Sequence, residues 1–258
     1  MFSTKTIELK SAAELDCMRR GAEILSQALA AAMAAVRPGA TTLELDRVAA
    51  AELGRRGAKP AFLGYRGFPA SLCVSINDEI IHGIPSAERR VREGDLVSLD
   101  LGCLYDGFYT DAAATVGAGS LAPDAQRILD VTKESLAAGI DAMRPDGRLG
   151  DYSGTVQRRV EAAGFSVVRE FVGHGIGRAL HEDPPVPNFG RAATGPRLVP
   201  GMVVALEPMV NAGGWEARTL SDGWTCVTKD GSLSAHFEHT VAMTAQGPEI
   251  LTWHGRRS

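Results

Sequence analysis

Paired cysteines, long apolar runs and a strong excess of charge are all absent from this sequence of 258 residues. The four cysteines never form a C-x-x-C pair. This spacing excludes a zinc knuckle and a disulfide framework, and it indicates a reducing compartment. The formal net charge is only −4, so charge provides no argument for binding nucleic acid or an anionic membrane.

Apolar segments long enough for export or membrane insertion are also missing. The start, residues 1–10, lacks the apolar core of a signal peptide. The longest apolar stretch, residues 22–36, contains Glu23, Ser26 and Gln27 and is shorter than a membrane span. We therefore expect a cytoplasmic protein that binds neither nucleic acid nor membrane.

Helix and strand signals alternate along the chain. Two capping boxes, Ser11 to Glu14 and Thr41 to Glu44, predict helices that run to about residue 36 and to near residue 57. Further helices are predicted from Pro123 to about residue 143 and over roughly residues 150–163. Strands are predicted at 71–76, within 80–85, on both sides of a turn at 106–107, at 167–172, at 202–207 and within 224–244.

The turn at Asp106-Gly107 predicts a tight hairpin, because both central positions favour positive φ. A two-residue loop places Asp100 opposite Ala113. It likewise places Asp111 opposite Gly102, so both carboxylates lie on one sheet face. A distance of about 7–8 Å is expected between the two Cα atoms. Two carboxylates in such a position repel each other unless a positive charge, for example a metal ion, lies between them. Taken alone, the pattern also fits two solvated aspartates, and a three-residue loop would put them on opposite faces.

A weak internal repeat relates two halves of the chain. A shift of 107 residues places Gly94–Asp100 on Gly201–Glu207. Asp100 and Glu207 then occupy equivalent positions, and a pseudo-twofold axis would direct both acids at one centre. The predicted single catalytic domain covers residues 1–258, with halves at roughly 11–117 and 123–245.

Five side chains could supply metal ligands at that centre: Asp100, Asp111, His174, Glu207 and Glu238. Glu238 lies in a strand between histidines, where a buried acid needs a charge partner. Four carboxylates and one imidazole suit divalent ions such as Mn²⁺, Fe²⁺ or Co²⁺. Two ions about 3.5–4 Å apart, with a bridging water, are an arrangement for hydrolysis.

Each candidate also has an ordinary structural explanation. His174 fits a glycine-rich turn, His181 fits a charged loop because two acids follow it, and His82 fits a strand end. The cysteines and aromatic residues such as Tyr65 and Trp224 fit a hydrophobic core. The joint occurrence of these residues in one order favours the metal site.

Several motifs follow one another along the chain: Asn77, His82-Gly83-Ile84-Pro85, Asp100, Asp111, Gly173-His174-Gly175-Ile176-Gly177, His181, Glu207-Pro208 and Phe237-Glu238-His239-Thr240. Together they resemble methionine aminopeptidase of type I, over nearly the whole chain. The resemblance implies an α+β pita-bread fold, with two pseudo-symmetric α/β halves around an antiparallel sheet. It also implies removal of the initiator methionine from nascent proteins whose second residue is small.

The resemblance further implies how the ligands divide between two divalent ions. Asp100 would chelate one ion, Asp111 and Glu238 would bridge both, and the remaining two ligands, His174 and Glu207, would bind the other. The ions would be Co, Mn, Fe or Zn. A monovalent cation near the backbone of Asn77, Glu79 and Ser234 is also implied.

Catalytic and substrate-binding roles follow from the same resemblance. A bridging water would attack the first peptide carbonyl, with Glu207 as proton acceptor. His181 would stabilise the tetrahedral intermediate or the scissile amide, and His82 would contact the substrate near its second residue. The methionine pocket would consist of Tyr65, Phe68, Cys73 and Trp224, whose walls suit a thioether. The implied partners are the N-termini of nascent polypeptides near the ribosome. The protein itself is expected to be a monomer.

The chain departs from the family's usual pattern at three positions, which concern the shape of the pocket. Leu180 stands where Phe or Tyr is usual, His236 where Gln is usual, and Phe62 where many bacterial members have a smaller residue. Two other functions remain open on the same fold. One is an Xaa-Pro aminopeptidase-like activity, and the other is a non-catalytic peptide-binding module.

Overall fold

The computed structural model describes residues 7–253. Both ends of the predicted domain of residues 1–258, and most of the segment 1–10 that was assessed for a signal peptide, lie outside the described residues. The helices are α1 (Ala12–Ala35), α2 (Thr42–Arg55), the 3₁₀ helix η1 (Tyr65–Gly67), α3 (Pro123–Ala142) and α4 (Leu149–Ala162). The strands are β1 (Lys59–Pro60), β2 (Leu72–Ile76), β3 (Glu79–Ile81), β4 (Leu96–Tyr105), β5 (Phe108–Gly117), β6 (Ser166–Val167), β7 (Gly173–Gly175), β8 (Glu182–Val186), β9 (Val203–Leu206), β10 (Met209–Asn211), β11 (Ala217–Thr219), β12 (Cys226–Thr228), β13 (Ser234–His236), β14 (His239–Thr244) and β15 (Gly247–Ile250). Between residues 7 and 253, no helix combines the length and apolarity of a membrane span.

Both predicted capping boxes are present. The Ser11 hydroxyl accepts a hydrogen bond from Glu14 N at 3.4 Å, and the Glu14 carboxylate accepts one from Ser11 N at 2.8 Å. Thr41 and Glu44 repeat this arrangement at 3.2 and 2.8 Å. The caps satisfy N–H groups that have no partner within the helix, so α1 and α2 begin where the sequence predicts.

The β4–β5 hairpin has the predicted register. Its ladder pairs Asp100 with Ala113 and Gly102 with Asp111. The loop has two residues, 106 and 107, with positive φ of 48° and 81°. Both aspartates therefore lie on one face of the hairpin.

Two of the predicted strands are shorter than expected. β6 ends at Val167, and the chain bends through residues 169 and 170, which are exposed. Phe171 and Val172 then line a cavity. These two residues are apolar because they form the cavity wall, and they do not extend the strand. β3 likewise ends at Ile81, because His82 has a positive φ of 60° and leaves the extended conformation.

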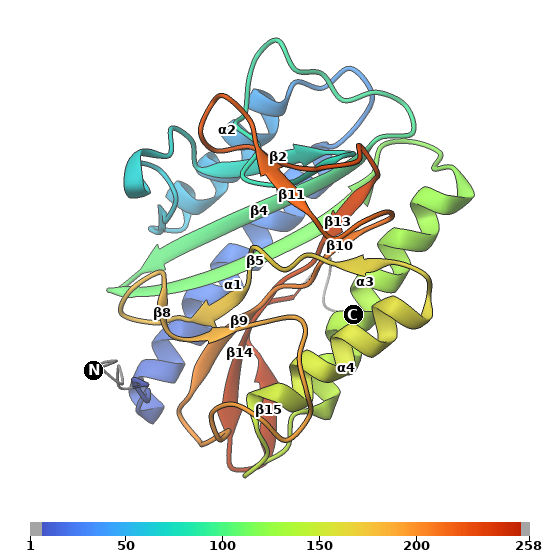
Figure 1. The fold of residues 1–258 in the computed structure, drawn as a ribbon. Helices are drawn as coiled ribbons and strands as arrows, with labels where there is room; N and C mark the ends of the chain where they lie inside the picture. The colour runs from blue at the N-terminus through green and yellow to red at the C-terminus, as the bar shows by residue number, and fades with distance from the viewer. Residues whose placement is uncertain (1–6, 254–258) are drawn as a thin grey trace.

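Two antiparallel sheets form the centre of the molecule (Figure 1). One has the order β1-β4-β2, with β5 paired to β4, and the other has the order β15-β14-β9-β7-β8. Two small sheets, β13-β10-β6 and β11-β12-β3, complete the β structure of the described residues. Figure 1 shows α1 and α2 behind the first sheet, and α3 and α4 packed side by side at one flank. Buried side chains such as Leu99 and Tyr152 belong to one large core between these layers.

The offset of 107 residues reappears in the element boundaries. It separates the first and last residues of α2 from those of α4, and it separates the start of β4 from the start of β9. The residues that cap the ends of α1 and α3, Val36 and Met143, differ by the same number.

A seam of hydrogen bonds joins β5 to residues 236–240, which lie more than 100 residues away in the sequence. Thr240 Oγ1 accepts from Asp111 N at 2.9 Å and donates to Asp111 O at 2.8 Å. Glu238 N donates to Ala113 O at 2.8 Å. Further along, the Thr115 hydroxyl bonds the backbone of residue 236 in both directions, at 2.9 Å each. The seam therefore fixes the backbones of Asp111 and Glu238 relative to each other.

We expect Thr240→Val to lower the free energy of unfolding by about 2–6 kcal/mol. The change keeps the shape of the side chain but leaves the buried backbone N–H and C=O of Asp111 without their partners, at about 1–3 kcal/mol each. Urea unfolding of the metal-free protein measures the loss. Thr219→Val, on the exposed strand β11, is the matched control, and equal effects of the two changes would contradict the importance of the seam.

Candidate metal centre and substrate pocket

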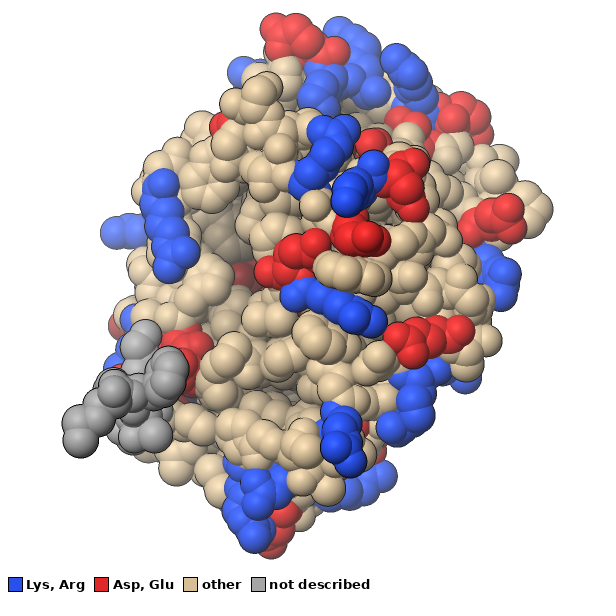
Figure 2. Space-filling view, viewed as in Figure 1, with Lys and Arg blue, Asp and Glu red and all other residues tan. Residues whose placement is uncertain are grey.

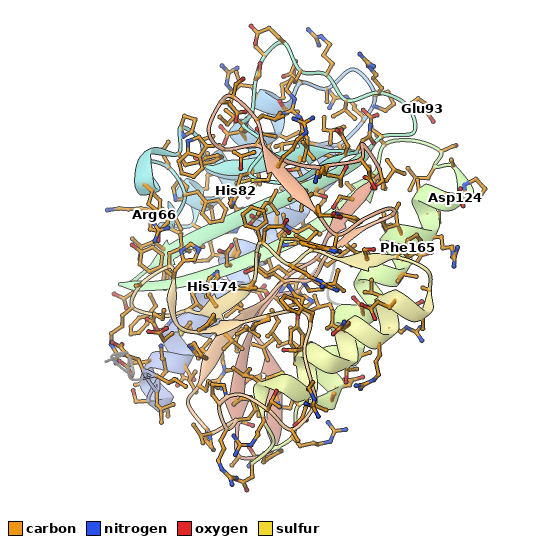
Figure 3. The ribbon with its side chains drawn as sticks, viewed as in Figure 1. Arg66, His82, Glu93, Asp124, Phe165 and His174 are labelled. Carbon is orange, nitrogen blue, oxygen red and sulfur yellow. The ribbon has the colours of Figure 1, made fainter. Side chains whose placement is uncertain are left out.

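A cavity of about 260 Å³ lies where the two main sheets meet. Figure 2 shows a hollow on this face of the molecule, with acidic side chains at its edge and in its depth. In the view of Figure 3, His82 lies above the β4–β5 hairpin and His174 below it, with Arg66 toward the left. All eleven side chains predicted for the site line this cavity: Tyr65, Phe68, Cys73, His82, Asp100, Asp111, His174, His181, Glu207, Trp224 and Glu238.

The five predicted metal ligands come from neighbouring strands. Asp100 and Asp111 belong to β4 and β5, and His174 belongs to β7, where it pairs with Ala205 of β9. Glu207 directly follows β9 and Glu238 directly precedes β14. Because the β9–β14 ladder ends with the residues next to these two acids, it places the acids opposite each other.

The distances between ligand atoms show that four of these five side chains lie close together. One ligand atom each from Asp111, His174 and Glu238 lie within 4.8 Å of one another. His174 Nε2 lies 3.5 Å from Glu207 Oε1. The structure therefore brings the carboxylates and the imidazole to one point of the cavity.

The four carboxylates are crowded together in the wall of one cavity. Burial raises the pKa of Asp100 to about 7. Burial and the neighbouring carboxylates also raise the pKa of Asp111, Glu207 and Glu238 well above the usual range. The buried Oδ1 of Asp100 has no hydrogen-bond partner among the described residues. A divalent cation fits this set of hard oxygen donors and would lower the pKa values again.

His174 presents the ring nitrogen that a metal needs. Its Nδ1 lies 2.9 Å from the carbonyl oxygen of Gly175, so we assign the proton to Nδ1 as the donor. Burial lowers the pKa of His174 to about 4, which keeps the imidazole neutral near pH 7. The lone pair of Nε2 is then free on the side of Glu207.

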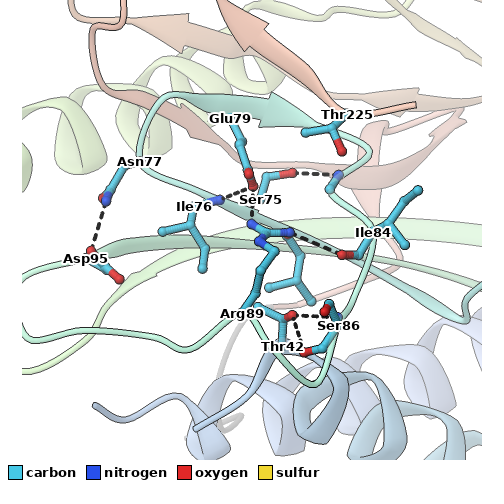
Figure 4. A network of polar contacts seen from close by, with 12 residues as sticks. Thr42, Ser75, Ile76, Asn77, Glu79, Ile84, Ser86, Arg89, Asp95 and Thr225 are labelled. Carbon is cyan, nitrogen blue, oxygen red and sulfur yellow. Dashed lines mark hydrogen bonds and ion pairs between the residues drawn. The ribbon is translucent and has the colours of Figure 1, made fainter. Parts of the chain in front are cut away.

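A polar network holds the turn that carries His82 (Figure 4). Gly83 N donates to Ser75 Oγ at 3.1 Å, and Gly83 O accepts from Val74 N at 2.9 Å. A Cβ atom on Gly83 would lie 2.1 Å from the Val74 carbonyl oxygen, so only glycine fits. Arg89 pairs with the Glu79 carboxylate and donates to the carbonyl of Ile84 at 3.1 Å.

The His82 ring lies against aromatic edges in the cavity wall. Its centroid is 5.9 Å from that of Phe171 and 6.2 Å from that of Trp224. Burial lowers its pKa to about 4. His82 is therefore a neutral hydrogen-bonding group near pH 7.

His181 lies beside His174, with 4.2 Å between the ring centroids. Its Nδ1 is 2.9 Å from the hydroxyl of Tyr65, and the two rings stack at 5.3 Å. Burial and the nearby charge of Arg66 lower the pKa of His181. Among the described residues, no hydrogen bond occupies the other ring nitrogen, Nε2.

The predicted methionine pocket adjoins the carboxylates. Phe68 and Trp224 meet edge to face at 5.1 Å. Cys73 of β2 pairs with Asp100 of β4. A residue of the pocket wall and a candidate metal ligand are therefore direct neighbours on adjacent strands. Burial raises the pKa of the Cys73 thiol well above its usual range, so this thiol is neutral.

The three departures from the family pattern occupy two kinds of position. Leu180 and Phe62 line the cavity, where they shape the pocket. His236 is not among the lining residues; its Nε2 lies 4.0 Å from Glu207 Oε2, behind the candidate ligand. Five further residues line the cavity although the sequence did not predict them there, and they lie beside predicted site residues or motifs: Arg66, Ile81, Glu170, Phe171 and Val172.

Known proteins match this chain closely. The profile of metallopeptidase family M24 matches residues 16–245. The chain is 52% identical to a methionine aminopeptidase of Clostridium perfringens over 95% of this chain and 98% of that relative. Methionine aminopeptidase 1 of Bacillus subtilis is 46% identical over 94% and 98%, respectively. The crystal structure of methionine aminopeptidase from Thermotoga maritima has a TM-score of 0.94 at 42% identity, and the match covers 96% of this chain and 99% of that one.

The chain therefore belongs to metallopeptidase family M24 and has its pita-bread fold, as the sequence predicts. Within this family it is a methionyl aminopeptidase of the type I kind. Prolidase from Pyrococcus furiosus shares the fold, with a TM-score of 0.77 at 23% identity, but this chain covers only 66% of that protein.

We expect Asp111→Asn to stabilise the metal-free protein by about 1–2 kcal/mol at pH 8, because it removes one charge from the repelling cluster. The raised pKa of Asp111 means that the folded state holds this proton more tightly than the unfolded state. Ionisation of Asp111 therefore destabilises the folded wild type fully at a pH above the raised pKa. It has no effect at a pH below the pKa of the unfolded chain, where the carboxyl is protonated in both states. The stability gained by Asp111→Asn should therefore vanish as the pH falls toward 4.

Urea unfolding with a chelator, repeated across pH, measures this gain, and added Mn²⁺ should stabilise the wild type far more than the variant. Asp16→Asn, at an exposed site, is the matched control. A variant that is less stable than the wild type without metal at pH 8 would contradict the repulsion.

Proposed function

We propose that this enzyme removes the initiator methionine from nascent proteins whose second residue is small. The observation that carries the proposal is one cavity in which five candidate metal ligands adjoin an apolar, thiol-lined pocket. The family supports it, because the relatives named above are methionine aminopeptidases.

Two divalent ions are proposed for the centre, drawn from Co, Mn, Fe and Zn. Asp100 would chelate one ion, His174 and Glu207 would bind the other, and Asp111 and Glu238 would bridge both. When bound, the ions would supply a water of lowered pKa and polarise the carbonyl oxygen. The seam to β5 supports the bridging role, because it fixes the backbones of Asp111 and Glu238 together.

The chain's own residues would handle the proton and the substrate. Glu207, whose pKa burial raises, would accept the proton of the attacking water. His181 would hydrogen-bond the scissile amide through the nitrogen that Tyr65 does not contact. His82 would contact the substrate near its second residue, where its neutral ring provides a donor or an acceptor.

The substrate's methionine would enter the pocket of Tyr65, Phe68, Cys73 and Trp224. An unbranched thioether packs well against aromatic edges and a neutral thiol. Leu180 and Phe62, which line the same cavity, would adjust the fit.

Several finer statements belong to the same proposal. We propose one catalytic domain built from halves at roughly residues 11–117 and 123–245, which the recurring offset supports. We also propose a cytoplasmic monomer that acts on nascent N-termini near the ribosome. A monovalent cation near Asn77, Glu79 and Ser234 is proposed as well, although the Glu79 carboxylate already pairs with Arg89.

Purified protein with Mn²⁺ or Co²⁺ should hydrolyse Met-Ala-Ser and leave Leu-Ala-Ser intact, because a γ-branched side chain fills the pocket differently from a thioether. Release of the free amino acid measures both. An Xaa-Pro aminopeptidase-like enzyme would instead prefer Gly-Pro-X over Met-Pro-X. Failure to cleave Met-Ala-Ser with any divalent ion would overturn the proposed function.

We expect His181→Ala to lower kcat by about 10²–10⁴-fold, the range for loss of a positioned acid or base, with Mn²⁺ binding unchanged. Glu238→Ala should instead lose bound metal, measured by elemental analysis and calorimetry. Unchanged metal content in Glu238→Ala would favour a non-catalytic binding module.

A further inference from the structure

A buried ion pair joins the N-terminal segment to the strand next to His181. The Lys10 ammonium contacts the Glu182 carboxylate, and these side chains are only 1% and 9% exposed. A buried lysine carries a desolvation cost that its partner must offset. The pair spans 172 residues of sequence, so it fixes two distant segments to each other.

The β7–β8 hairpin connects this pair to residues that line the cavity. His174 lies in β7, His181 precedes β8, and Glu182 begins β8 opposite Gly175. His181 lines the cavity, while the carboxylate of the next residue, Glu182, contacts Lys10 of the N-terminal segment.

The Glu182 carboxylate also closes the loop between the two strands. Its Oε1 accepts from Ala179 N at 3.0 Å, while its Oε2 contacts Lys10. On the other side of the loop, Tyr109 N of β5 donates to Gly177 O at 2.7 Å. The segment that carries His181 is thus held at both ends.

Lys10 is itself held rigidly. Its backbone N donates to Gly201 O at 2.7 Å, and its ammonium donates to Glu8 O at 3.1 Å. It also passes close to the loop: a Cβ atom on Gly177 would lie 2.0 Å from Lys10 Cε. A lysine held in this way can fix the position of its partner Glu182, which a mobile surface lysine cannot do.

We propose that Lys10 is a positioning residue for His181. It acts through Glu182, whose carboxylate fixes the conformation of the loop that carries His181. The loop in turn holds the His181 imidazole in contact with Tyr65 and His174. The inference rests on the proposed function for the catalytic role of His181. The placement of the imidazole does not depend on that role.

The same loop offers a matched control. Arg178 pairs with Glu8 and Glu14 of the N-terminal segment, but its side chain is 46% exposed. Exposed pairs of this kind contribute little, whereas loss of one partner of a buried pair leaves an uncompensated charge. Arg178→Met should therefore leave the loop in place.

The test compares Lys10→Met, Glu182→Gln and Arg178→Met with the wild type as Mn²⁺-loaded enzymes on Met-Ala-Ser. We expect kcat to fall about 10- to 100-fold in the first two, the scale of a misplaced catalytic group. KM and Mn²⁺ affinity should change less than about twofold, because the pocket and the ligands are untouched. Arg178→Met should change kcat less than about twofold.

A double-mutant cycle separates positioning from a general loss of stability. In a His181→Ala background, Lys10→Met should lower kcat no further, because the group that it positions is gone. A further tenfold loss there, or an unchanged kcat in both Lys10→Met and Glu182→Gln, would overturn the proposal.

A measurement without turnover keeps the two proposals apart. In the metal-free full-length chain, the ¹H–¹³C imidazole signal of His181, assigned with His181→Gln, should shift or broaden in Lys10→Met and Glu182→Gln but not in Arg178→Met. An unmoved signal in both buried-pair variants would overturn the positioning role. Wild type that cleaves no methionyl peptide, with the signal shifting as expected, would count against the proposed function alone.

Discussion

Four carboxylates that must share one small cavity impose the main constraint on this structure. Without a cation they repel each other and hold their protons, as the raised pKa values of Asp100 and its neighbours show. The scaffold must therefore keep them together against their own charge. It does so with strand ladders and backbone hydrogen bonds, because these persist whether or not the carboxylates are ionised.

The scaffold meets this constraint by joining two pairs of antiparallel strands. The β4–β5 pair carries Asp100 and Asp111, and the β9–β14 pair ends beside Glu207 and Glu238. The seam between β5 and residues 236–240 locks the two pairs together through main-chain atoms and two threonine hydroxyls. Hydrogen bonds between uncharged groups thus hold the charged side chains in place.

Local features of the chain were the most predictable. The caps at Ser11 and Thr41 and the two-residue turn after residue 105 depend on neighbouring residues, and all three are confirmed. The strand predicted at 167–172 was largely wrong, because a cavity wall and a sheet both select apolar residues. The seam could not be predicted at all. Thr240 and Asp111 are 129 residues apart, and no local sequence pattern around either residue indicates that it contacts the other.

The sequence by itself determined the identity of the ligand-type residues, the register that puts Asp100 and Asp111 on one face, and the family pattern. These follow from spacing, because turns and strand alternation act over a few residues. Only the tertiary structure decided that all eleven candidates line one cavity, that His236 lies behind Glu207, and that Lys10 supports the strand next to His181. Such contacts join segments far apart in the chain, and packing between those segments sets them, which no local preference encodes.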